Sequence, residues 1–124
     1  QNLCGSVYRN GNVLFTPDGN CLLSPVGNRV TVFDLTEHVS WTLPVENRRD
    51  IETICLSPDG KLLVSVDKDG RALVVAMARK AVLHRINFKG RPRVIKFSPD
   101  GQFLAVAVGR QVQIWRAPPA HKQV

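Results

Sequence analysis

The sequence has 124 residues, of which 44% are hydrophobic and 22% are charged, a composition typical of a folded domain rather than of a disordered chain. Its longest strongly apolar run, FLAVAV at 103–108, is far too short to cross a bilayer as a helix. The net charge of +7 is uneven, because residues 1–62 carry five basic and seven acidic side chains whereas residues 63–124 carry twelve basic and three acidic ones. A polyanionic partner is therefore a question for the second half only.

The first predicted unit, residues 12–47, follows a short candidate strand in NLCGSVY at 2–8. NVLF has the two-residue period of a strand and leads into the tight turn FTPDG. Proline suits the first corner of a type I turn, aspartate follows it well, and glycine accepts the positive φ that closes the reversal, so Pro17, Asp18 and Gly19 receive structural roles. NCLLS and RVTVFDL predict the next two strands, and SWTLPV at 40–45 predicts a fourth.

The same pattern returns twice. Residues 48–88 contain ETICL, the turn LSPDG, KLLVSV, RALVVAM and AVLHRI, and residues 89–116 contain RVIKF, the turn FSPDG, QFLAVAV and QVQIW. The corresponding structural turn residues are Pro58, Asp59, Gly60, Pro99, Asp100 and Gly101. The last unit has no fourth strand, and the tail at 117–124 carries two prolines, which do not continue a sheet.

The three corner prolines are separated by 41 residues each time, and apolar positions recur in step with them. Four short antiparallel strands repeating about every 40–45 residues are typical of a β-propeller blade. We therefore predict an all-β fold, a partial propeller of about three blades of four-stranded antiparallel sheets, with blade 1 at 12–47, blade 2 at 48–88 and an incomplete blade 3 at 89–116. Because propellers close with about four to eight blades, we expect a piece of a longer protein, in which 1–11 is a candidate closing strand.

No constellation of residues predicts catalysis. His38, His84 and His121 are scattered without cysteine or carboxylate at ligand spacing, and no glycine-rich phosphate loop occurs. The recurring aspartates belong to the turns. The odd set of Cys4, Cys21 and Cys55 predicts a reducing compartment without a disulfide framework, and the latter two fit small core positions. We expect no enzyme, no metal, no cofactor, no small-molecule substrate and no membrane contact.

The remaining feature is positive charge. Between Arg79 and Lys96 the sequence has seven basic residues and no acidic one, and the stretch KGRPR falls in the loop between the second and third blades. Lys89, Arg91, Arg93 and Lys96 are the candidate RNA- or partner-binding residues, because lysine and arginine supply sequence-independent contacts to phosphates. A solvated loop, RNA and an acidic protein partner are the three interpretations of this charge.

The SPDG turn resembles that of the WD-repeat family. The Trp-Asp pair of that family appears only as Phe33-Asp34 and as Trp115-Arg116, and its Gly-His pair is missing, so the side-chain hydrogen-bond network of well-formed WD repeats is expected to be absent. SPVGNRVTVFDL at 24–35, LSPDGKLLVSVDKDGRALVV at 56–75 and VLHRINFKG at 82–90 are more specific. They resemble the amino-terminal part of the periodic tryptophan protein 2 family of nucleolar WD-repeat proteins.

This resemblance implies a non-catalytic scaffold propeller of the small-subunit processome, which supports small nucleolar ribonucleoprotein-dependent processing of the small-subunit ribosomal RNA precursor in ribosome biogenesis. The implied partners are other processome proteins in a multi-subunit complex, with pre-ribosomal RNA and small nucleolar RNA contacted directly or through them. The implied location is the nucleolus within the nucleus. The alternative function is a generic WD-repeat adaptor that binds peptide ligands, for example in ubiquitination or trafficking.

Overall fold

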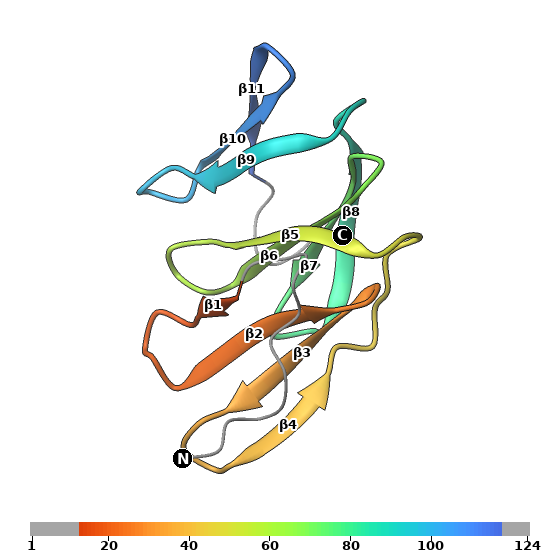
Figure 1. Ribbon diagram of the computed structural model, residues 1–124. Coiled ribbons are helices and arrows are strands. Elements are labelled where there is room, and N and C mark those ends of the chain that lie inside the picture. Colours follow the sequence, from red (N-terminus) through yellow and green to blue (C-terminus); the bar gives the residue numbers. More distant parts are fainter. Residues whose placement is uncertain (1–12, 118–124) are drawn as a thin grey trace.

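In the computed structural model, residues 13–117 are described, and they form three antiparallel sheets (Figure 1). The first sheet contains β1 (Leu14–Phe15), β2 (Cys21–Val26), β3 (Arg29–Asp34) and β4 (Val39–Thr42). The second contains β5 (Ile51–Leu56), β6 (Leu62–Asp67), β7 (Arg71–Ala76) and β8 (Ala81–Asn87), and the third contains β9 (Pro92–Phe97), β10 (Phe103–Val108) and β11 (Gln111–Arg116). These sheets, here called blades 1, 2 and 3, confirm the all-β fold with an incomplete third blade. The candidate closing strand at 1–11 and residues 118–124 of the tail lie outside the described residues.

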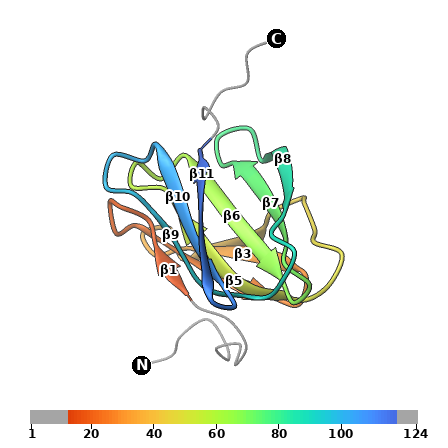
Figure 2. The same ribbon diagram turned by 90° about the horizontal axis from the view of Figure 1, so that it is seen from above.

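Each blade is a meander in which consecutive strands are neighbours. The first strands of the blades lie side by side, since β5 contacts both β1 and β9. Seen from above, β10 and β11 lie over β6 of blade 2, so that the blades are layered one upon the next (Figure 2). In the described part of the chain, no helix is long and apolar enough to cross a membrane.

Blade 2 is buried on both of its faces. All six residues of β6 and five of the six in β7 are buried, which explains why LLVSVD and ALVVA lack the alternation of half-exposed strands. On one face Val64 shares a core cluster with Val106 of blade 3, and on the other Leu63 shares a core cluster with Leu23 of blade 1. Each such side chain contributes about 1.5–3 kcal/mol when it is fully buried. Blade 2 is therefore the wall that both neighbouring blades share.

The outer face of blade 3 has no such cover among the described residues. Val112 and Ile114 of β11 are 69% and 63% exposed, and Val94 of β9 is 51% exposed. An open series of blades is expected to leave an apolar face of this kind in contact with solvent.

The turn after the first strand of every blade has one hydrogen-bond pattern. In blade 2, the Ser57 hydroxyl donates to Oδ1 of Asp59 at 2.6 Å and accepts from the Leu62 N–H at 3.0 Å, while the Lys61 N–H donates to the same Oδ1 at 3.0 Å. Gly60 closes the turn with a φ of 77°. The hydrogen bond from Ser57 is the main reason that the pKa of Asp59 lies below its ordinary value. Hydroxyl and carboxylate together satisfy backbone donors that the sharp reversal removes from the strand ladder.

Blades 1 and 3 repeat this pattern with their own side chains. The hydroxyls of Thr16 and Ser98 each donate to the following aspartate, Asp18 and Asp100, at 2.6 Å. In Figure 1 the three turns lie in line at the left of the molecule. Each hairpin is consequently closed by the same four-residue device.

Successive turns also touch each other. A Cβ atom added to Gly60 would lie 3.0 Å from Cδ of Pro17, and one added to Gly101 would lie 3.6 Å from Cδ of Pro58. The corner proline of one blade thus packs against the closing glycine of the next blade. Glycine at these positions provides both the positive φ and the room for the proline ring.

Replacing Ser57 by alanine is expected to loosen the blade 2 turn. Ser57 is buried, and its loss leaves the buried Leu62 N–H without an acceptor, which costs about 1–3 kcal/mol. Amide hydrogen exchange across residues 57–62 measures the effect and should become faster by the corresponding factor. Ser40→Ala removes an exposed hydroxyl and serves as the control. Equal exchange in the two variants would remove the hydroxyl from this account.

Candidate interaction surface

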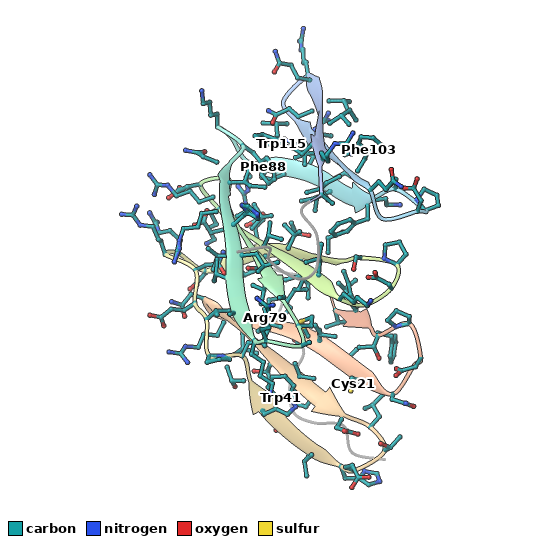
Figure 3. The ribbon with its side chains drawn as sticks, turned by 180° about the vertical axis from the view of Figure 1, so that it is seen from behind. Cys21, Trp41, Arg79, Phe88, Phe103 and Trp115 are labelled. Atoms are coloured by element: carbon teal, nitrogen blue, oxygen red, sulfur yellow. The ribbon has the colours of Figure 1, made fainter. Side chains whose placement is uncertain are left out.

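The candidate surface, here called the loop face, is formed by the connections at the end of the blades opposite the repeated turns. Antiparallel meanders bring every second connection to the same end. The loop face comprises the turn at 27–28, the loop at 43–50, the turn at 68–70, the loop at 88–91 and the turn at 109–110. Figure 3 shows nitrogen-tipped side chains along the side of the molecule where these connections lie.

Buried side chains fix the loop at 43–50 between blades 1 and 2. The Asn28 amide donates to the Asn47 carbonyl at 2.9 Å, and the Asn47 amide donates to the Ser65 carbonyl at 3.1 Å. The Ser65 hydroxyl returns a hydrogen bond to Oδ1 of Asn47 at 2.9 Å. From the sequence we expected the hydrogen-bonded side-chain network of well-formed WD repeats to be absent. The structure shows a smaller contact between the two blades, the hydrogen-bonded pair of Asn47 and Ser65. Asn47 and Ser65 are 5% and 2% exposed, so the pair holds the loop against β6.

A second set of contacts fixes the loop at 88–91 between blades 2 and 3. The Phe88 N–H donates to the Gly70 carbonyl at 2.9 Å, and a Cβ atom on Gly70 would lie only 2.0 Å from the Gly90 carbonyl oxygen. The Phe88 ring is fully buried and meets Trp115 edge to face at 5.6 Å. Gln113 accepts from the Trp115 indole at 3.0 Å and donates to the Phe88 carbonyl at 3.2 Å. The loop face is therefore held rigidly across all three blades.

The structure places the four candidate basic residues in two groups. Lys89, Arg91 and Arg93 lie in the loop before β9 and at the start of that strand, and all are exposed. Arg91 binds Oε2 of Glu52 through Nε at 2.9 Å and through its terminal nitrogen. Lys96 lies three residues after Arg93, about 10 Å farther along β9. There it borders a cavity beside the first strands of the blades. Lys89, Arg93 and Lys96 have no ion pair in the described part of the chain.

Three further cations at the loop face are not among the four candidates that the sequence predicts. Arg48 lies in the loop at 43–50, while Arg71 and Arg85 come from β7 and β8. Arg71 lies opposite Asn87, and Leu73 lies opposite Arg85, which puts all four residues on one face of blade 2. Only the strand register reveals this grouping, because fourteen positions separate the two arginines in the sequence.

The cysteines have surroundings that disfavour a reactive thiolate. Burial raises the pKa of the thiol of Cys55, and it also raises the pKa of Cys21, where Asp34 and Asp18 add to the effect. Within residues 13–117, no three His, Cys, Asp or Glu side chains gather in a group that could hold a metal ion. The chemistry that the loop face offers is binding through cations and amides.

Replacing Gly70 by alanine is expected to displace the loop at 88–91. Gly70 and Gly19 have φ values of 84° and 75°, so alanine strains the backbone similarly at both positions. Only at Gly70 would the methyl group overlap another backbone, whereas Gly19 has nothing within 4 Å. Hydrogen exchange at residues 86–90 should rise clearly more in Gly70→Ala than in the matched variant Gly19→Ala. A similar response in both would mean that the close approach of the two glycines is not structural.

Comparisons with known proteins agree with this architecture. The family model described as "WD domain, G-beta repeat" matches residues 32–74. Hydrazine synthase of Kuenenia stuttgartiensis superposes with a TM-score of 0.74 over 94% of this chain and 36% of its own, at 22% sequence identity. At that identity the likeness concerns the fold alone.

Among curated proteins, the chain is similar to periodic tryptophan protein 2 of several eukaryotes. It is 51% identical to the Saccharomyces cerevisiae protein over 98% of this chain, and 50% identical to the Mus musculus homologue over 95%. The Arabidopsis thaliana protein is 46% identical over all of it. The chain spans only 13% of the length of the yeast and mouse relatives and 14% of the plant one.

Proposed function

This chain is homologous to periodic tryptophan protein 2, and from that premise we propose that it forms part of a non-catalytic scaffold propeller of the small-subunit processome. In this function the protein supports small nucleolar ribonucleoprotein-dependent processing of the small-subunit ribosomal RNA precursor. It works in the nucleolus, within a complex of many proteins. Its RNA partners are the pre-ribosomal RNA and the small nucleolar RNA, reached directly or through neighbouring proteins.

The observation that carries the proposal is the identity of about half of all positions over nearly the whole chain. The build of the loop face supports it as well. A scaffold has to present its contacts in a fixed arrangement, since ordering flexible loops on binding costs free energy. Asn47 and Phe88 hold the two longer loops to neighbouring blades before any partner arrives.

The charge of the loop face fits contact with RNA. Lys89 and Arg93 are exposed beside the ion pair of Arg91 with Glu52, and Lys96 is exposed farther along β9. Cations of this kind bind phosphates without regard to base sequence and release condensed counterions when they do so. These four residues are the proposed contacts of blade 3 with RNA.

The RNA contacts are tested in the whole protein that contains this chain by replacing Lys89, Arg91, Arg93 and Lys96 together by alanine. If about four phosphates are bound, the slope of log affinity for single-stranded RNA against log salt should become shallower by roughly 3. Arg79→Ala, in the turn at the opposite end of blade 2, serves as the matched control and should leave the slope unchanged. An unaltered slope in the quadruple variant would remove these residues from the proposal.

The cellular function is tested by affinity purification of the whole protein. Ribosomal precursor RNA and nucleolar proteins should dominate the recovered material. Recovery of a ubiquitin ligase or of trafficking proteins in their place would favour the adaptor function and reject the scaffold.

A further inference from the structure

A cavity of about 430 Å³ lies at the loop face between blades 1 and 2. The loop at 43–50 borders it on one side, and β7 and β8 border it on the other. Its size is within the range of sites that hold a side chain or a small group of a ligand. The lining residues that matter for its chemistry are Arg48, Asp67, Arg71, Leu73 and Arg85.

The cavity combines an apolar floor with a cationic rim. Leu73 is 9% exposed and belongs to the core cluster shared with blade 1, so its side chain forms the floor. Ile86 lies opposite Ala72, and its side chain packs on the other face of blade 2. Arg48, Arg71 and Arg85 are exposed, and each comes from a different element. No ring of Phe, Tyr or Trp is present among its lining residues.

The three guanidinium groups are free to meet an anion. The ion pairs among residues 13–117 join Arg29 to Glu46, Arg49 to Asp69 and Arg91 to Glu52, and they include none of these three arginines. The cavity's own glutamate, Glu46, is therefore already neutralised by Arg29 at 3.0 Å. Positive charge prevails at the rim.

Asp67 contributes a carboxylate oxygen that lacks a hydrogen-bond donor within residues 13–117. Its Oδ1 accepts from the N–H groups of Asp69 at 2.9 Å and Arg71 at 3.0 Å, but its Oδ2 is buried without a hydrogen-bond partner among the described residues. A buried acceptor without a donor is costly, and an N–H group brought by a ligand would relieve that cost. A peptide backbone carries such an N–H donor at almost every residue, whereas the phosphates of RNA only accept hydrogen bonds and its 2′-hydroxyl is the one donor of the sugar-phosphate backbone.

We propose that this cavity binds an acidic peptide segment of a protein partner. One aliphatic side chain of the peptide rests on Leu73, and flanking carboxylates meet the forked guanidinium groups of Arg48, Arg71 and Arg85. RNA is the less suitable ligand, because the lining offers no aromatic surface on which a base could stack. The site goes beyond the proposed RNA contacts, since it shares no residue with the four basic candidates of blade 3.

The test uses the whole protein, its double variant Arg71→Gln/Arg85→Gln and a fluorescein-labelled peptide of repeated Asp-Glu-Leu. Fluorescence anisotropy should show that the peptide binds the parent and that the double variant binds it at least about tenfold more weakly, because charge-assisted hydrogen bonds are lost. Arg79→Gln/Arg110→Gln removes the same charge outside the cavity and should change the affinity by less than about twofold. Unchanged hydrogen exchange in blade 2 confirms that the double variant is folded.

Three further probes test the contributions of charge and of apolar contact, and test whether the ligand is protein or RNA. A peptide of Asn-Gln-Leu should bind far more weakly, as should one of Asp-Glu-Gly, which lacks the anchor. An unaffected double variant, or equal binding of the uncharged peptide, overturns the proposal. If single-stranded oligouridylate competes with the peptide and loses affinity in the same double variant, the cavity is an RNA site and the proposal is likewise wrong. The quadruple variant at blade 3 should bind the peptide normally, so the two sites can fail independently.

Discussion

The structure depends on a hydroxyl group that serves two neighbours at once in each of the repeated turns. Thr16, Ser57 and Ser98 donate to an aspartate two residues on and accept from the first N–H of the following strand. This arrangement fixes where each second strand begins, and with it the register of the whole hairpin. Because the same turn recurs every 41 residues, the blades have matching lengths and their corner prolines meet the glycines of the next blade.

From this constraint follows the placement of the loop face. Once the turns align at one end, the connections between the second and third strands and between blades must gather at the other end. Buried contacts then join these connections across the blades, through Asn47 with Ser65 and through Phe88 with Gly70 and Trp115. The arginines of this fixed surface fall into two groups, those in ion pairs and those without one among residues 13–117. Arg29, Arg49 and Arg91 are bound to carboxylates, while Arg48, Arg71 and Arg85 surround a cavity.

The strands and the incomplete third blade could be predicted from the sequence, because two-residue periodicity and the SPDG turns are local signals. The contacts between blades could not. Asn47 and Ser65 lie in segments with no mutual pattern, and nothing in the sequence indicates that Gly70 approaches Gly90. The basic candidates were predicted as a loop group at 89–93 and Lys96 in the strand RVIKF. What the sequence does not show is how far β9 carries Lys96 from Lys89, and that Glu52 of β5 binds Arg91. Such pairings depend on how blades pack, which charge counts along the chain do not contain.

A side-chain-resolved cryo-EM map of the intact protein would test the central claim most directly, since that claim concerns how turns position blades. It should show the Pro17 ring against Gly60 and the Pro58 ring against Gly101, with each hydroxyl between its aspartate and the following strand. Helices at these positions, or sheets whose turns do not touch, would contradict the account.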